Sequence, residues 1–143
     1  MRTHARKMLA LAFVLAFAGG CGMFTRPGVD PPWMARYHWD AVASNDLGMT
    51  MFHYTPASTL EWVGGPLQGK YSGTTALAEV WTKFFYAQGY MNVEVSNVQA
   101  RQEGARHIVT ARTIFKGRQV VPVDYALVFE GDRVVAETWK VSP

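Results

Sequence analysis

The chain has 143 residues, which is enough for one ordinary domain. Its formal net charge is +3, but Arg2, Arg6 and Lys7 all lie in the first seven positions. Without these three, 11 of the 14 basic residues remain, and they balance the 11 acidic residues. A near-neutral domain excludes the basic surface that nucleic-acid binding requires, so no nucleic-acid partner is expected.

The first 20 residues have the layout of a secretory signal peptide. Their basic start is followed by an apolar run, Met8–Ala18, and then by Gly19 and Gly20. The run is too short to cross a bilayer as a helix, which needs about 20 apolar residues. We therefore expect residues 1–20 to be removed on export.

Cys21 is the only cysteine, so no disulfide can form within the chain. Its place directly after two glycines resembles the bacterial lipobox, in which the cysteine is acylated with groups such as palmitate and becomes the first mature residue. The resemblance implies a lipid anchor on Cys21. Because Gly22 is not aspartate, it also implies transport to the outer membrane, facing the periplasm. Residues 21–32 then form a lipidated tether, and residues 33–143 form the domain. Plain secretion with an incidental cysteine is the alternative.

Three helices are expected in the domain. The first follows Pro31-Pro32, and its apolar face is set by five residues at helical spacing: Met34, Tyr37, His38, Ala41 and Val42. Asp46 is placed to cap a short second helix, from Leu47 to about Tyr54. The third helix follows Ser72-Gly73 and ends near Gly89, with an apolar stripe made of Leu77, Val80, Trp81, Phe84 and Phe85.

Five strands are expected. The alternating segment Ser58–Val63 is the first, between the second and third helices. Four more segments, rich in β-branched and aromatic residues, fill the last third: Met91–Ala100, His107–Phe115, Gln119–Glu130 and Arg133–Val141. Short turns between them predict an antiparallel meander. The order α-α-β-α-β-β-β-β indicates an α+β fold, with three helices packed on a curved antiparallel sheet.

The last hairpin can be paired residue by residue. A two-residue turn at Gly131-Asp132 places Glu130 opposite Arg133. Counting back from the turn gives three further pairs: Val128–Val135, Ala126–Glu137 and Asp124–Trp139. In this register Asp124 and Glu137 are diagonal neighbours on one face, with about 7–8 Å between their backbone positions.

Which face of this hairpin is buried decides what the two acids do. If Asp124 and Glu137 point inward, desolvation and mutual repulsion raise the pKa of at least one, which suits proton transfer. Alternatively, periodicity alone turns the more apolar face toward the core and leaves both acids in water. That face carries Val121, Val123, Tyr125, Leu127 and Phe129.

The element order, together with the segments Ser72–Trp81 and Val121–Asp124, resembles the nuclear-transport-factor-2-like superfamily. Within this superfamily the chain is most similar to the SnoaL-like polyketide cyclases and the ketosteroid isomerases. The resemblance extends from Ala35 to Val141. It implies a cone, in which a bent sheet wraps over three helices around an apolar pocket. It also implies an inward Asp124, with the opposite face of the sheet covered by a second sheet in a homodimer.

The ketosteroid isomerases rely on a carboxylate base on the first strand, a tyrosine on the first helix and a protonated acid on a late strand. The resemblance places Asp124 at the position of the late-strand acid and His38 at the position of the tyrosine on the first helix. Trp62 falls at the base position, and tryptophan cannot accept a proton. Glu61 is adjacent but points to the opposite face of its strand. Steroid isomerase activity is therefore doubtful, and any acid–base chemistry would need Glu137 or His38 as its base.

The remaining candidate residues are apolar or aromatic. Trp62, Trp81, Phe84, Tyr54 and Trp139 are expected to line the pocket, with core packing as the alternative for each. His4, His53 and His107 have no spacing that suggests a metal site, so neither a metal nor a cofactor is expected.

Three functions fit these observations. The first is an envelope lipoprotein that binds a small, largely apolar ligand, with Asp124 and His38 supplying polar contacts. The second is an acid–base enzyme, an isomerase, cyclase or dehydratase, acting on such a ligand. The third is a non-catalytic subunit of an envelope assembly, which a pocket filled by the chain's own aromatic side chains would favour.

Overall fold

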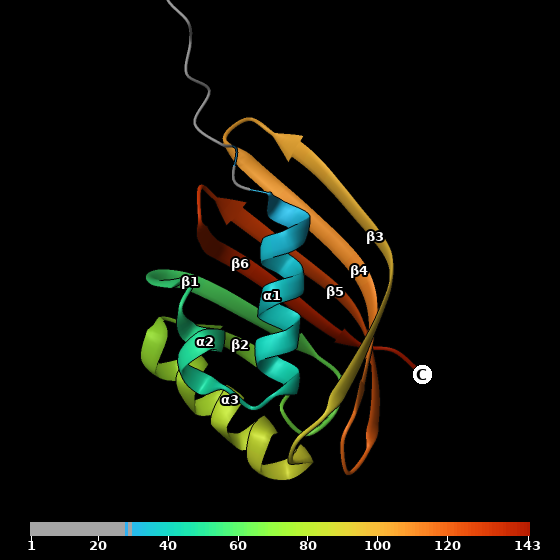
Figure 1. The fold of residues 1–143 in the computed structure, drawn as a ribbon. Helices are drawn as coiled ribbons and strands as arrows, with labels where there is room; N and C mark the ends of the chain where they lie inside the picture. Colours follow the sequence, from blue (N-terminus) through green and yellow to red (C-terminus); the bar gives the residue numbers. More distant parts are fainter. Residues whose placement is uncertain (1–27, 29) are drawn as a thin grey trace, which may run out of the picture.

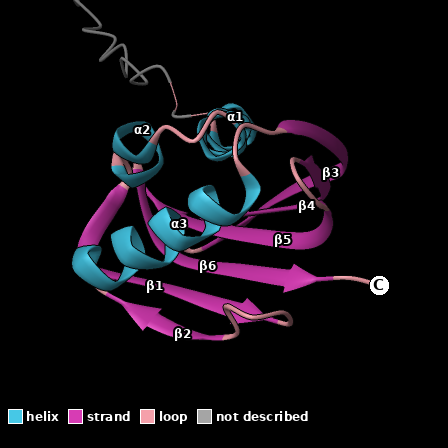
Figure 2. Ribbon diagram, turned by 90° about the horizontal axis from the view of Figure 1, so that it is seen from below, coloured by secondary structure: helices cyan, strands magenta, loops and turns pink. Residues whose placement is uncertain are grey.

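The computed structural model describes residue 28 and residues 30–143. Within this part, all three helices lie on the same side of a curved six-stranded sheet (Figures 1 and 2). The predicted α+β architecture is confirmed. The predicted signal peptide and Cys21 lie outside the described residues. No helix in residues 30–143 is long and apolar enough to cross a membrane.

The helices are α1 (Pro31–Ala43), α2 (Leu47–Met51) and α3 (Thr74–Gln88). Asp30 and Asp46 cap α1 and α2, because their side chains accept hydrogen bonds from backbone N–H groups of the first turn. The predicted start of α1 and the Asp46 cap are confirmed. The second helix ends at Met51 rather than near Tyr54, because Tyr54 already pairs with the sheet as the first residue of a strand.

The sheet has the strand order β2-β1-β6-β5-β4-β3. Its strands are β1 (Tyr54–Val63), β2 (Gly69–Ser72), β3 (Asn92–Glu103), β4 (Arg106–Lys116), β5 (Val120–Glu130) and β6 (Arg133–Val141). Two points correct the prediction. β2 was not expected, since four residues containing a glycine give no usable alternation. The sheet is mixed rather than antiparallel, because β1 runs parallel to β6.

A bulge in β6 changes the predicted register of the last hairpin. Glu130 pairs with Arg133 as predicted, but Val128 pairs with Ala136, which leaves Val135 as an extra residue. Beyond the bulge every predicted pair is displaced by one position, and the observed pairs are Leu127–Glu137, Tyr125–Trp139 and Asp124–Lys140. Because side chains alternate along a strand, this displacement moves Glu137 to the opposite face from Asp124.

The space between helices and sheet is filled by aromatic side chains. Their rings form one continuous network of contacts, in which Tyr125 links Trp39 to the others. The remaining members are Trp62, Trp81, Phe84, Phe115 and Trp139. The ring centroids of Trp62 and Trp139 are 4.5 Å apart and stacked. Those of Phe115 and Trp139 are 4.9 Å apart. Such pairs add about 0.5–1.5 kcal/mol each beyond the area that they bury.

Candidate functional site

A polar cluster lies inside the apolar core, centred on the carboxylate of Glu137. The hydroxyls of Tyr54 and Tyr125 each donate a hydrogen bond to it, one to each oxygen. His38 Nε2 lies 3.3 Å from Glu137 Oε1. The indole N–H of Trp81 donates to the hydroxyl of Tyr54 at 3.0 Å. Four separate elements, α1, β1, β5 and β6, therefore converge on one carboxylate, and α3 supports them through Trp81.

Local sequence explains how each group reaches this point. His38 belongs to the apolar face of α1, so the packing of that face carries the imidazole into the core. Tyr125 lies on the apolar, buried face of β5. The β6 bulge turns Glu137 toward the same side. A buried carboxylate is tolerated only when donors surround it, and the cluster supplies them.

Burial and charge both act on the two tyrosines. Burial raises the pKa of Tyr54 and of Tyr125 well above the usual value, and the nearby Glu137 carboxylate raises both pKa values further. Both phenols therefore keep their protons and remain donors to Glu137.

The histidine is held from one side only. Its Nε2 also lies 3.5 Å from the hydroxyl of Tyr54 and 3.3 Å from that of Tyr125. Its Nδ1 is buried and has no hydrogen-bond partner in the described part of the chain. The tautomer with a proton on Nε2 fits best, because that N–H can then donate to Glu137.

The cluster is closed to solvent. The side chains of His38 and Glu137 have no exposed surface. The stacked rings of Trp62 and Trp139, with Trp81 beside them, lie in the core around it. Trp81, Tyr54 and Trp139, which were predicted to line a ligand pocket, thus occupy the core or support the polar cluster. The cluster has donors and an acceptor suited to proton transfer, but because it is buried, a substrate reaches it only if surrounding side chains move.

A separate apolar pocket of about 290 Å³ opens beside α3. Its lining comes from α3, from the segment after β1 and from the adjoining ends of β5 and β6: Trp62, Gly64, Gly65, Pro66, Leu67, Lys83, Phe84, Ala87, Gln88, Gln119, Val120, Val121 and Val141. Trp62 and Phe84 are the two predicted ligand residues that line this pocket. Since Trp62 also stacks on Trp139, the wall of this pocket is continuous with the aromatic network of the core.

The structure contradicts the predicted inward position of Asp124. Its side chain is 53% exposed on the outer face of the sheet, where Arg112 Nη1 donates to it at 2.9 Å. Ser142 Oγ donates to its other oxygen at 2.7 Å. The hydrogen bond from Ser142, followed by that from Arg112, lowers the pKa of Asp124, so this acid does not show the rise that was expected for at least one of the two acids. Asp124 therefore lies apart from both the buried cluster and the apolar pocket.

Tyr125 is the residue of the cluster that the favoured sequence interpretation missed. The apolar periodicity of β5 did point to Tyr125, because the alternative interpretation placed the more apolar face of this strand toward the core. The structure shows that this face is buried. An outward apolar face was also the reason for expecting a second sheet to cover it. That reason no longer holds, although dimerisation itself stays a prediction.

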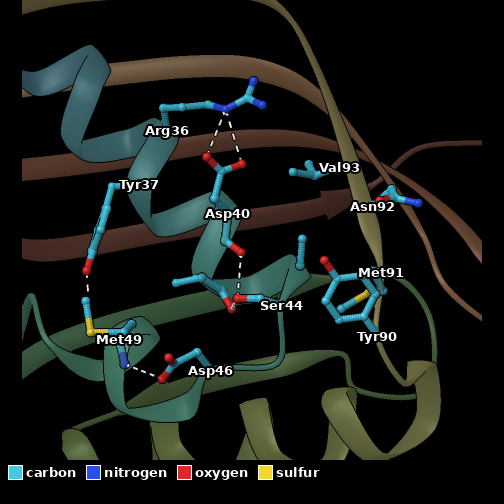
Figure 3. Close-up of a pocket in the computed structure, with 12 residues that line it drawn as sticks. Arg36, Tyr37, Asp40, Ser44, Asp46, Met49, Tyr90, Met91, Asn92 and Val93 are labelled. Atoms are coloured by element: carbon cyan, nitrogen blue, oxygen red, sulfur yellow. Dashed lines mark hydrogen bonds and ion pairs between the residues drawn. The ribbon is translucent and has the colours of Figure 1, made fainter.

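A second hollow, of about 530 Å³, runs between α1, α2 and the start of β3 (Figure 3). Two of its three charged groups pair with each other, since Arg36 Nε lies 3.2 Å from the carboxylate of Asp40. The third, Asp46, accepts a hydrogen bond from the backbone N–H of Met49 as the cap of α2. Ser44 Oγ donates to the backbone oxygen of Asp40 at 2.9 Å. In the part of the chain that the structure describes, no three His, Cys, Asp or Glu side chains come together as metal ligands. The apolar pocket is therefore the better candidate for a ligand.

Comparison with known proteins finds similarity only at the level of structure. No protein-family model and no curated protein matches the chain. An NTF2-like protein of unknown function from Pseudomonas putida KT2440 is similar, with a TM-score of 0.65 and 14% identity over 76% of this chain and 81% of that one.

Two further solved structures have names that suggest an activity. One is from Streptomyces avermitilis, and its assignment as a dehydratase of the NTF2-like family is provisional. It has a TM-score of 0.64 and 13% identity over 77% of this chain and 92% of that one. The other is a ketosteroid isomerase-like protein from Erwinia carotovora atroseptica SCRI1043, with a TM-score of 0.58 and 22% identity over 78% and 93%. At these identities the similarity concerns the fold alone, and the chain has the NTF2-like fold.

Proposed function

We propose that this chain is an envelope lipoprotein whose NTF2-like domain binds a small, largely apolar molecule in the pocket beside α3. The observation that carries the proposal is that pocket, with Trp62 and Phe84 in its wall. Small-molecule sites are typically apolar hollows with a few placed polar groups. The signal-peptide layout and the lipobox-like position of Cys21 support the envelope location.

The lining limits the class of ligand. At about 290 Å³ the pocket is near the lower end of the usual range, roughly 300–1,000 Å³, which favours a compact ligand of one or two rings or a short acyl chain. The side-chain oxygen of Gln88 already accepts from the backbone N–H of Gln119 at 3.0 Å, so only its amide N–H groups remain to donate to a ligand. Lys83 is the charged group at the edge, so a ligand with an acidic end is favoured.

A thermal-shift screen tests this proposal. The panel contains fatty acids, aromatic acids, steroids and polyketides, each at several concentrations. A ligand present at about 100 times its Kd stabilises the folded chain by roughly 2.7 kcal/mol. A shift that saturates with one chemical class supports the pocket. If no compound in the panel raises the unfolding temperature, the favoured function becomes that of a non-catalytic subunit of an envelope assembly, which the aromatic-filled interior also favours.

Acid–base catalysis is the second candidate function, and the buried cluster around Glu137 favours it. A carboxylate held by two tyrosine donors, with a histidine beside it, can take up and return a proton. Access requires movement of the side chains that bury the cluster. If a ligand from the screen is turned over, Glu137→Gln should lower kcat by about 10²-fold or more. Unchanged turnover in Glu137→Gln would exclude this function for the cluster.

A further inference from the structure

Four aromatic rings form a connected surface cluster over the first turns of α1 and the end of α2. We name these residues, Trp33, Tyr37, Phe52 and His53, the Trp33 cluster. Successive ring centroids are 5.6 Å apart between Trp33 and Tyr37, 6.1 Å between Tyr37 and His53, and 5.0 Å between His53 and Phe52. Trp33 is 62% exposed and Phe52 is 61% exposed. The other four tryptophans of the chain are at most 3% exposed, so Trp33 stands apart from them.

The cluster is fixed to the domain on its inner side. His53 Nδ1 donates to the backbone oxygen of Asp132 at 2.8 Å. The hydroxyl of Tyr37 donates to the sulfur of Met49 at 3.4 Å. Trp33 stacks on Tyr37 one helical turn away. The two most exposed rings, those of Trp33 and Phe52, therefore flank a centre that is held in place.

Most charges at the edge of the cluster are paired with each other; the exception is the carboxylate of Asp30, which accepts a hydrogen bond from the backbone N–H of Trp33 as the cap of α1. Arg36 lies against Asp40 at 3.2 Å, and Arg133 lies 3.5 Å from Asp132. The surface around the rings is thus close to neutral, which does not favour a strongly acidic or basic partner. Tryptophan and tyrosine instead favour the boundary between membrane and water, because each ring is apolar and carries one polar group.

The place of the cluster along the chain indicates which apolar surface it meets. Cys21 precedes Asp30, the cap of α1, by nine residues, so a fully extended chain between them spans at most about 30 Å. Trp33 follows the cap by three residues. A lipid on Cys21 would therefore hold the Trp33 cluster at high local concentration beside the bilayer. A short tether of this kind makes even a weak contact with lipid effective.

We propose that the Trp33 cluster docks onto the phospholipid surface of the membrane, an inference that rests on the proposed lipid anchor. In this orientation the start of α1 faces the bilayer. The C-terminal end of α3 lies toward the opposite end of the domain (Figure 1), and residues near that end of the helix line the apolar pocket. Docking through Trp33 would thus leave the pocket mouth open to the aqueous side.

Bromine quenching of tryptophan fluorescence tests the docking. The full chain is expressed in a Gram-negative bacterium, purified from membranes, and reconstituted into vesicles of phosphatidylethanolamine and phosphatidylglycerol. Matched vesicles contain phosphatidylcholine brominated on its acyl chains. The expected result is clear quenching of the parent chain. Most of that quenching should be lost in Trp33→Phe, which removes the exposed indole but keeps an apolar ring.

A second pair of variants separates docking from the origin of the signal. Phe52→Ser retains Trp33 but weakens the contact with lipid, so quenching should fall. Tyr86→Ser removes an even more exposed aromatic ring from α3, outside the cluster, and should leave quenching unchanged. Equal quenching in Phe52→Ser and the parent chain would overturn the proposal. So would a concentration-dependent dimer in detergent that Phe52→Ser abolishes, since a second copy would then cover the cluster.

Flotation of the same vesicles distinguishes failure of the anchor from failure of the docking. A parent chain that does not float with lipid contradicts the proposed lipid anchor and the docking together. A chain that floats but shows no quenching of Trp33 retains the anchor and contradicts the docking alone.

Discussion

The hydroxyl of Tyr125 donates a hydrogen bond to the carboxylate of Glu137, although the hairpin register expected from the sequence places these residues on opposite faces of the sheet. The contact exists because Val135 is an extra residue in β6, and the bulge turns Glu137 inward. A single inserted residue thus lets one of the two acids enter the core without the other. It is Glu137 that does so, while Asp124 stays on the surface.

Glu137→Gln should destabilise the fold even in the absence of a ligand. The amide presents an N–H group to donors that already need an acceptor, so at least one buried tyrosine hydroxyl loses its partner. The expected cost is about 1–3 kcal/mol, measured by urea unfolding. Glu130→Gln is the matched control, because that acid is exposed and pairs with Arg106 at 2.7 Å. The control should change stability by less than about 0.5 kcal/mol. Equal effects of the two variants would contradict a structural role for Glu137.

Stability should fall at alkaline pH. The folded-state pKa values of Tyr54 and Tyr125 lie above the unfolded value of 10, so above pH 10 the folded chain binds more protons than the unfolded chain. This stabilisation is present below pH 10 and is lost as pH rises toward the folded pKa values. Each tyrosine contributes a slope of up to about 1.4 kcal/mol per pH unit.

Urea unfolding at a series of pH values from neutral to strongly alkaline measures this slope. Tyr125→Phe should reduce it, since one of the two shifted groups is removed. Tyr86→Phe is the control, because that ring is exposed on α3. A slope that is the same in the parent chain and Tyr125→Phe would contradict the burial of that phenol beside Glu137.

Asp124→Asn should leave ligand affinity and any turnover unchanged. The carboxylate lies on the outer face of the sheet and contacts Arg112 and Ser142 rather than the pocket. Titration of each hit from the ligand screen, with the parent chain and the variant in parallel, measures this. A large loss of affinity in Asp124→Asn would indicate that ligands bind on the outer face instead.

Cys21 and Gly22 should determine where the chain resides. Cys21→Ser removes the acylated thiol, so the protein should move from the membrane fraction to the soluble periplasmic fraction. Gly22→Asp should retain the lipidated chain in the inner membrane, because aspartate after the lipidated cysteine opposes transport to the outer membrane. Separation of the two membranes on a sucrose gradient measures both. A Cys21→Ser chain that stays in the membrane fraction would contradict the lipid anchor.

Much of the fold could be predicted because the apolar periodicity of the main elements is strong. The stripe that includes Leu77 and Phe84 predicts α3, Pro31-Pro32 marks the start of α1, and Asp46 predicts the cap of α2. β2 could not be predicted, since its four residues are ordered by pairing with β1 rather than by their own pattern. The parallel contact of β1 with β6 joins segments about 75 residues apart, and local patterns carry no information on it.

The site was predicted only in part. His38 and Glu137 were both candidates, and the structure brings them together. The chemistry of the cluster differs from the expectation for two reasons. The resemblance favoured an inward Asp124 over the apolar face of β5 that carries Tyr125, and the bulge that separates Glu137 from Asp124 cannot be recognised in the alternation of β6. Of the five predicted pocket residues, Trp62 and Phe84 line the apolar pocket. Whether an aromatic side chain forms a pocket wall or fills the core depends on tertiary packing, which residue type alone does not determine.

The most direct test of the proposed binding site fills the apolar pocket without disturbing the core. Ala87 lines the pocket from an exposed position on α3, so Ala87→Phe should place a ring in it with little loss of stability. Ala78→Phe, on a different face of the same helix, is the matched control. Calorimetric titration of the ligand found by the screen should show binding to the parent chain and to Ala78→Phe, and no binding to Ala87→Phe. Undiminished binding to a folded Ala87→Phe chain would contradict the assignment of this pocket.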